Sequence, residues 1–208
     1  MSMTELDEHQ QWEAIKAWWK ENGRLIITVV VVVSIAIVGF KYWQSTQKTN
    51  AQQASILYDQ LLNNAYSSNP SDATLAIIAN KLQEDHARTP YASAAALFEA
   101  KAAAERGDLQ AAQDKLIWVV DHSKDSNLRQ IARLRLARVL LAENQPDQAL
   151  EKLSKVDNET YIPAINLVKG DIFTLKNNKI EAEKAYKEAL KGVSSLPNQP
   201  MMQYLQMQ

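Results

Sequence analysis

The 208-residue chain lacks several features on which catalytic and metal sites depend. It has no cysteine, which excludes disulfide bonds, thiolate nucleophiles and thiolate metal ligands. Its five glycines are too scattered to cradle a phosphate, and no G-x-S-x-G, P-loop, H-E-x-x-H or dinucleotide-binding motif occurs. The three histidines, His9, His86 and His122, lie far apart in the sequence. We therefore expect no enzymatic activity, no cofactor and no metal ion.

The chain also lacks an excess of charge of either sign. It contains 23 basic and 24 acidic residues, and its pI is near 6.3. Over 44–208, basic and acidic residues are equal in number. Binding of nucleic acid through its phosphates requires a clustered positive surface. The composition therefore disfavours nucleic acid as a partner.

One uncharged segment is far more hydrophobic than the rest of the chain. Residues 25–40 read LIITVVVVVSIAIVGF. As a helix this run is about 24 Å long, or about 28 Å with residues 41–43, close to the roughly 30 Å hydrocarbon core of a bilayer. Lys41 can extend its amino group to the headgroups, and Tyr42 and Trp43 suit the interface. The sequence predicts a transmembrane helix at 25–43, a leader at 1–24 and a domain at 44–208.

Two other interpretations of this segment fit less well. A buried core helix would be surrounded by protein and usually tolerates polar interruptions, whereas this run contains no charged residue. A cleavable signal peptide has an apolar region of about 7 to 15 residues. Here the run is longer, and the bulky Tyr42 and Trp43 follow it directly. We expect an uncleaved anchor.

The orientation of the anchor is predicted from the basic residues that flank it. Lys16, Lys20 and Arg24 precede the span, and Lys41 and Lys48 follow it. Loops with more Lys and Arg stay in the cytoplasm. The bias of three against two places the N terminus in the cytoplasm.

The leader has the pattern of an amphipathic helix beside the membrane. Trp12 and Trp19 lie two helical turns apart, Trp18 is adjacent, and charged residues flank them. Asn22 and Gly23 predict a helix end before the span. The indoles can serve as an aromatic anchor or, alternatively, as a partner site. The predicted membrane-interface residues are Trp12, Trp18, Trp19, Lys41, Tyr42 and Trp43.

After the span, the sequence predicts helices throughout. Alanine and leucine are abundant, only three glycines occur, and no stretch of alternating β-branched residues is long enough for a sheet. The predicted helices are about 12 to 20 residues long. The predicted breaks between them lie at 67–70, 89–90, 106–108, 123–127, 144–146, 157–163, 177–179 and 194–200.

The predicted helices recur in pairs. Aligning Ala112, Ala149 and Ala182 superimposes three turn-helix segments, and the two intervals between these alanines are similar. A period close to 34 with two helices per unit is typical of a tetratricopeptide repeat, where small residues let helices approach closely. The matching small residues of the first helices are Ala100, Ala137 and Gly170. We predict an all-α fold, a transmembrane helix followed by a tetratricopeptide-like α-solenoid, with unrelated helical hairpins as the alternative.

Two further segments complete this prediction. Residues 51–88 supply a preceding, degenerate helix pair. Met201–Gln208 form a terminal cap over the last apolar face. Both pieces matter, because an array of fewer than three units is marginally stable.

In such an array the first helices line a concave surface, which suits a partner helix or an extended segment. Apolar positions mixed with single charges are expected there, and the alternative is that the leucines are ordinary core. The predicted groove residues are Leu97, Lys101, Leu134, Arg138, Leu141, Leu167, Asp171 and Thr174.

One basic cluster occurs in the segment LRQIARLRLAR. The helical period places Arg129 and Arg133 together, and Arg135 and Arg138 roughly opposite them. Such an arrangement gives two arginine pairs and no continuous nucleic-acid stripe. Each pair either binds acidic neighbours within the domain or clamps a carboxylate of a partner.

Several stretches together indicate a family: AIKAWWKENGR before the span, GFKYWQS at its end, LRLARVLL and LVKGDIF in the repeats, and PMMQYLQ near the C terminus. With them the chain resembles the ancillary SecYEG translocon subunit family, of the YfgM type, over nearly its whole length. The resemblance implies a single-pass inner-membrane protein with a cytoplasmic N terminus and a periplasmic domain. It implies the SecYEG translocon and the periplasmic chaperone PpiD as partners, and a link of the cytoplasmic tail to the Rcs stress pathway.

We expect a non-enzymatic adaptor tethered in the lipid bilayer, where tethering raises the effective concentration of its binding domain. It would link the translocon to periplasmic chaperones during export of newly translocated proteins. The alternative is a regulator of envelope stress signalling that acts through the cytoplasmic N-terminal segment.

Overall fold

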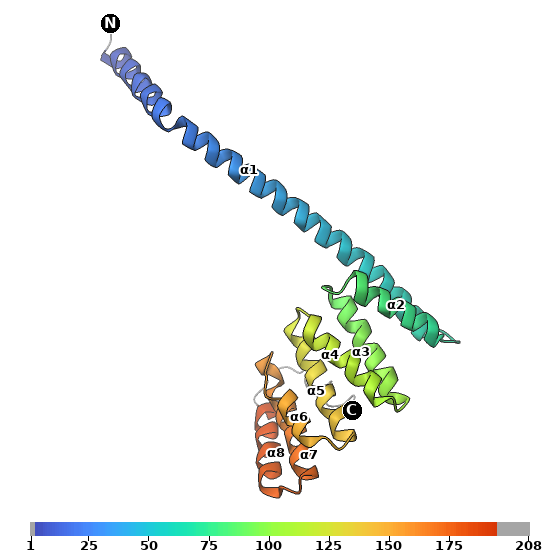
Figure 1. Ribbon diagram of the computed structural model, residues 1–208. Helices are drawn as coiled ribbons and strands as arrows, with labels where there is room; N and C mark the ends of the chain where they lie inside the picture. Colours follow the sequence, from blue (N-terminus) through green and yellow to red (C-terminus); the bar gives the residue numbers. More distant parts are fainter. Residues whose placement is uncertain (1–2, 195–208) are drawn as a thin grey trace. The chain divides into compact units, whose positions relative to one another are not determined.

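The computed structural model describes residues 3–194, and the chain forms two compact units, Met1–Thr49 and Asn50–Gln208 (Figure 1). No strand occurs among residues 3–194, which confirms the predicted all-α class. The proposed cap at Met201–Gln208 lies outside the described residues. The helices are α1 (Met3–Ala65), α2 (Asp72–Asp85), α3 (Pro90–Glu105), α4 (Leu109–His122), α5 (Ser126–Ala142), α6 (Pro146–Lys152), α7 (Ile162–Leu175) and α8 (Lys179–Ser194), with a short 3-10 helix η1 (Glu159–Tyr161).

Helix α1 continues through Gly23, so the predicted helix end at Asn22 and Gly23 is wrong. The Asn22 side chain donates to the carbonyl of Trp18 at 3.1 Å and does not cap a helix end. Gly23 keeps a helical backbone, and a Cβ there would lie 3.1 Å from Nε1 of Trp19. The indole therefore covers the glycine, which removes the exposed backbone that usually favours a break. Figure 1 shows α1 changing direction within its blue, N-terminal part.

Helix α1 is the one helix in the described chain that is long and apolar enough to cross a membrane, and its apolar stretch lies in the first unit. Its apolar side chains are exposed, with Ile35 and Val38 each at 67%. Thr28 and Ser34 interrupt the run, but their hydroxyls donate to Arg24 O and Val30 O at 2.8 Å. All polar groups in this stretch can therefore be satisfied within the helix, as the bilayer requires.

The second unit is built from pairs of helices. The end of α1 shares a buried cluster with α2. Three further pairs follow, α3 with α4, α5 with α6 and α7 with α8. The small residues that defined the repeat are buried in these helices, which confirms the predicted register. They are Ala100, Ala112, Ala137, Ala149, Gly170 and Ala182.

Side-chain caps and turns fix where these helices begin. Thr89 Oγ1 accepts from Ala92 N at the start of α3, where Pro90 follows the cap. Asp108 Oδ1 accepts from Ala111 N at 3.1 Å and begins α4. Such caps satisfy amides that have no partner within the helix. The predicted breaks at 89–90 and 106–108 are confirmed.

Each of the three later pairs turns through a residue with left-handed backbone. Gly107, Asn144 and Asn177 have φ angles of 80°, 60° and 57°. In each turn two amides bond back to the preceding helix, as Asn144 N does to Leu141 O and Gln145 N to Leu140 O. This is the Schellman arrangement that ends helices. The intervals between these three positions equal those between Ala112, Ala149 and Ala182, so the turns follow the same repeat as the buried alanines.

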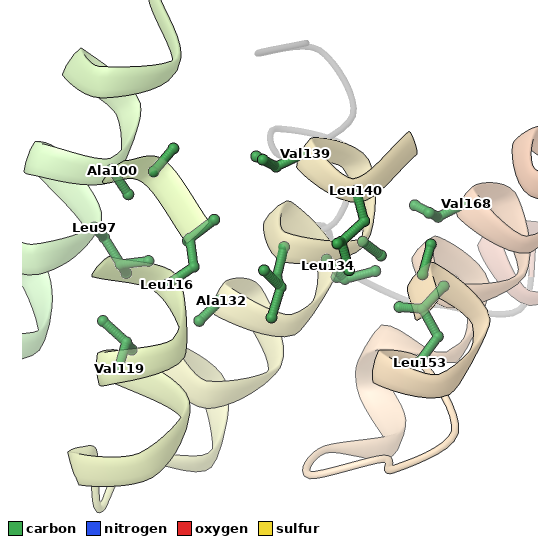
Figure 2. Close-up of a cluster of buried hydrophobic side chains, with 14 of the residues drawn as sticks. Leu97, Ala100, Leu116, Val119, Ala132, Leu134, Val139, Leu140, Leu153 and Val168 are labelled. Atoms are coloured by element: carbon green, nitrogen blue, oxygen red, sulfur yellow. The ribbon is translucent and has the colours of Figure 1, made fainter. Parts of the chain in front are cut away.

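The core of the second unit consists of two clusters of buried apolar side chains. The larger runs from α3 to α7 (Figure 2) and includes Leu116, Leu134, Leu140, Leu153 and Val168, all at most 1% exposed. The smaller joins the end of α1 to α2 and α3. Trp118 packs against both clusters. The apolar core is therefore nearly continuous along the array.

Helix α6 is shorter than the predicted 12 to 20 residues, whereas α1 is longer because it runs unbroken from the leader to Ala65. Helix α6 ends at Lys152, and the chain then turns toward η1. The turn brings Asp157 against α5, where it binds two arginines.

The first helices of successive pairs lie next to one another. Successive first helices contact one another, α3 with α5 and α5 with α7, whereas second helices mainly contact first helices. First helices are therefore packed more closely, and their free faces form the inner surface of the array, as in other solenoids.

Candidate partner-binding surface

Helix α3 contributes Lys101 to the inner surface. Its side chain is 65% exposed and lies 3.6 Å from Glu105 Oε1 in an equally exposed pair. Leu97 lies one turn earlier and is 7% exposed within the core cluster. Leu97 therefore supports this surface from beneath.

Helix α5 presents a face of mixed chemistry. Arg138 and Leu141, both predicted for the groove, are half-buried there. Leu134 is fully buried, at 0% exposed, and belongs to the core. Ile131 and Arg135 are half-buried and were not among the predicted groove residues, although Arg135 was predicted to pair with Arg138. Ile131, Arg135 and Arg138 lie within an arc of about 60° around the helix axis, from the helical period.

Helix α7 adds Leu167, Asp171 and Thr174, the first half-buried and the other two exposed. Tyr186 of α8 holds the two polar residues. Its hydroxyl donates to Asp171 Oδ1 at 2.8 Å and lies 3.3 Å from Thr174 Oγ1. Burial and the Asp171 carboxylate raise the pKa of Tyr186 above its ordinary value. Tyr186 therefore remains a neutral donor over the physiological range.

Gly170 allows this arrangement. A Cβ at Gly170 would lie 2.3 to 2.7 Å from the ring of Tyr186, closer than any real contact. Only glycine lets the ring cross α7 at this point and reach Asp171. The small residue that the repeat predicts thus also fixes the polar part of the inner surface.

Of the eight predicted groove residues, six have surface on the inner face and two lie in the core. The difference is one of helix rotation. Leu97 on α3 and Leu134 on α5 point between the helices and into the core. The helical spacing places Ile131 on the same face as Arg135 and Arg138, since it precedes them by four and seven positions.

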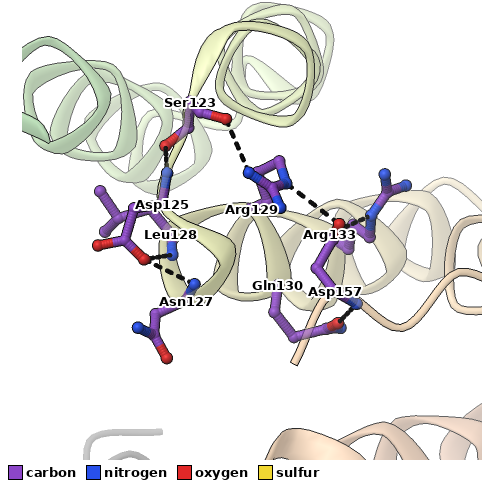
Figure 3. Close-up of polar contacts among 8 residues, drawn as sticks. All are labelled: Ser123, Asp125, Asn127, Leu128, Arg129, Gln130, Arg133 and Asp157. Atoms are coloured by element: carbon purple, nitrogen blue, oxygen red, sulfur yellow. Dashed lines mark hydrogen bonds and ion pairs between the residues drawn. The ribbon is translucent and has the colours of Figure 1, made fainter. Parts of the chain in front are cut away.

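The four arginines of α5 divide into two pairs, as the helical period predicts. Arg129 and Arg133 converge on Asp157, at 3.1 and 2.7 Å (Figure 3). Asp157 N also donates to Gln130 Oε1 at 2.8 Å. Burial would raise the pKa of Asp157, but hydrogen bonds from Arg133 and Arg129 outweigh it and hold the pKa below its ordinary value. Through Asp157, Arg129 and Arg133 join α5 to the segment between α6 and α7.

A cleft of a different kind lies between α6, α7 and α8. It has a volume of about 370 Å³. Its charged lining is balanced, with Lys169 and Lys184 opposed by Glu181 and Glu188. A balanced cleft selects no sign of charge. The inner face of α5 is therefore the more selective surface.

The predicted membrane-interface residues are exposed in the first unit. Trp12, Trp18 and Trp19 are 63%, 55% and 50% exposed, and Tyr42 and Trp43 are 77% and 57% exposed. Lys41 is exposed as well. Exposed rings at both ends of an apolar helix are the usual pattern of interfacial anchors, and their contact with lipid stays a prediction.

Known proteins are similar to this chain over most of its length. The family model described as "Tetratricopeptide repeat-like domain" matches residues 16–208. The ancillary SecYEG translocon subunit of Aggregatibacter actinomycetemcomitans is 37% identical over 194 residues, 93% of this chain and 94% of that protein. The proteins of the same name from Haemophilus influenzae and Escherichia coli are 34% identical over 194 residues and 29% identical over 197 residues. These two alignments cover 93% and 95% of this chain and 94% of each relative. No solved structure matches the chain.

Proposed function

The chain belongs to the ancillary SecYEG translocon subunit family, and we propose that it is a non-enzymatic, membrane-anchored adaptor at the SecYEG translocon. The observation that carries the proposal is the joining of two parts in one chain. An exposed apolar helix of membrane-spanning length precedes a helical repeat domain. Such a domain binds partners through a preformed surface, and an anchor keeps it near membrane complexes.

The finer proposal concerns place and partner. The anchor spans the inner membrane once, with the N terminus in the cytoplasm and the repeat domain in the periplasm. There the domain links SecYEG to the periplasmic chaperone PpiD as newly translocated proteins emerge. The support is the family membership and the flanking basic residues, and the balanced charge of the chain supports protein rather than nucleic-acid partners.

Photocrosslinking in intact membranes tests the adaptor function. A crosslinking amino acid is placed at Lys101 or Leu167 on the inner surface, and at Asp121 or Lys124 as matched exposed controls. We expect adducts with translocon subunits or PpiD from the first two positions only. Adducts confined to the controls would reject the inner surface as the binding site. Failure of translocon subunits to co-purify in mild detergent would reject the function.

A second candidate function is regulation of envelope stress signalling through the leader. It is favoured by the three exposed indoles of a leader that is helical throughout residues 3–24. Deleting residues 2–20 separates the two. The regulator predicts loss of the stress phenotype with translocon binding intact, and the adaptor predicts an unchanged phenotype.

A further inference from the structure

The four arginines of α5 have unequal roles in the fold. Arg129 and Arg133 are committed to Asp157, which is 5% exposed at its side chain. Arg135 and Arg138 lie on the inner face of the same helix, one turn apart and half-buried. Side chains at this spacing are neighbours, with Cβ atoms roughly 5 to 6 Å apart. Two guanidinium groups therefore share one surface.

Arg135 lacks a counter-charge among the described residues. In the described part of the chain, Arg135 has no carboxylate within ion-pair distance. Two acidic residues that flank the inner face are already engaged, Glu105 with Lys101 and Asp171 with Tyr186. A half-buried charge beside a like charge is unfavourable unless an opposite charge joins it. Arg135 therefore gives the inner face of α5 an uncompensated positive charge in a domain that is neutral overall.

Ile131 lies one helical turn before Arg135 and on the same arc as Arg138. Its half-buried side chain offers apolar surface next to the guanidinium groups. Half-burial strengthens an ion pair relative to one in open solvent, because the effective dielectric constant is lower. Arginine is also less strongly hydrated than lysine and donates from a planar fork that matches a carboxylate.

We infer that the partner segment seated on the inner surface carries an acidic side chain, which Arg135 binds beside Arg138 while an apolar residue next to it packs on Ile131. This inference rests on the proposed adaptor function and names the chemistry of its partner. The occupant is an acidic, amphipathic protein segment.

Peptide binding to the full chain in detergent tests the chemistry directly. The probes are fluorescent peptides of Leu-Ala-Glu-Ala repeats and matched peptides with Gln or Lys in place of Glu. We expect the Glu peptide to bind about tenfold more tightly than the Gln peptide, the difference typical of a charged hydrogen bond. The Lys peptide should bind most weakly. Equal affinities for the Glu and Gln peptides would overturn the inference.

Three variants assign the effect to the arginine. Arg135→Gln should remove most of the preference for Glu, and Arg135→Lys should retain part of it, since the charge stays and the fork is lost. Lys124→Gln removes one exposed positive charge beside α5 and should leave the preference unchanged. Equal losses in Arg135→Gln and Lys124→Gln would show a net-charge effect only and would contradict the site. Circular dichroism melts confirm that each variant is folded.

Crosslinking from Leu167 separates the failure of this inference from failure of the proposed function. Translocon or PpiD adducts that weaken severalfold in Arg135→Gln support both. Adducts that form equally in Arg135→Gln and the unchanged chain, together with no peptide preference, reject the acidic contact and keep the adaptor. Absence of adducts in the unchanged chain rejects the proposed function, and the inference falls with it.

Discussion

Asn144 and Asn177 adopt the same left-handed backbone conformation one repeat apart, with φ angles of 60° and 57°. Each follows the first helix of a pair, and each donates its amide to a carbonyl of that helix, at 2.9 and 3.0 Å. Gly107 holds the equivalent position in the preceding pair. Asparagine tolerates this conformation better than most residues but still less well than glycine. The two later turns therefore store backbone strain that the first does not.

Replacing either asparagine with glycine should stabilise the domain. We expect Asn144→Gly and Asn177→Gly each to raise the free energy of unfolding by about 0.5 to 1 kcal/mol, through relief of strain in the folded turn. Asn178→Gly is the matched control, because the Asn178 side chain accepts from Glu181 N and begins α8. It should not stabilise. Urea titration followed by circular dichroism measures the three values, and destabilisation by both turn variants would contradict the argument.

The ion pairs of Asp157 should contribute strongly to stability. Asp157→Asn leaves Arg129 and Arg133 partly buried without a counter-charge, which should lower the free energy of unfolding by about 2 to 3 kcal/mol at pH 7. Asp121→Asn, an exposed carboxylate on α4, should change it by less than about 0.5 kcal/mol. Equal effects of the two substitutions in chemical denaturation would show that the arginine contacts add nothing.

The same site should make stability depend on pH in one direction. The pKa of Asp157 in the folded chain lies below its ordinary value of 3.8. Its contribution is therefore present above pH 3.8 and is lost as the pH falls through the folded pKa. The stability difference between the unchanged chain and Asp157→Asn should be constant from neutral pH to about pH 5 and shrink below that. A difference that grows on acidification would contradict this sign.

The sequence predicted the repeat register well and the rotation of its helices less well. Ala112 and Ala149 lie where two helices pack closely, and such close packing requires a small side chain. The spacing of small residues in the sequence therefore identifies these positions. Which apolar residue faces the inner surface depends on the packing angle of each pair. Leu134 was therefore predicted to face the inner surface, although it is fully buried.

The predicted helix end at Gly23 was wrong because of a contact that the local sequence does not reveal. The Trp19 side chain covers the glycine, so the helix continues.

Asn144 and Asn177 are residue types that tolerate left-handed turns, and they continue the repeat that begins at Gly107. This regular spacing is present in the sequence, and together with the alanines it supports the repeat assignment more strongly than the alanines alone.

Gly170 should be intolerant of even one added methyl group. In Gly170→Ala the new Cβ would overlap the Tyr186 ring, so the ring must move and lose its bond to Asp171. We expect a loss of about 1 to 3 kcal/mol, typical of overpacking. In a Tyr186→Ala background the same change should be neutral or stabilising, because alanine favours helix over glycine. Equal effects of Gly170→Ala in both backgrounds, measured as a double-mutant cycle, would contradict the contact.

The apolar part of α1 should hold the chain in membranes. Its side chains are exposed to 49% at Val33 and 60% at Val32, so the first unit offers them no apolar core of its own. Each lysine near the middle of a span costs about 2.5 to 3.5 kcal/mol, and the double variant Val32→Lys and Val33→Lys should release the chain on alkaline carbonate extraction. Thr46→Lys with Gln47→Lys adds the same charge beyond the span and should leave the chain in the membrane pellet. Release of the unchanged chain by carbonate would show that α1 does not cross the bilayer, and the anchored adaptor would lose its premise.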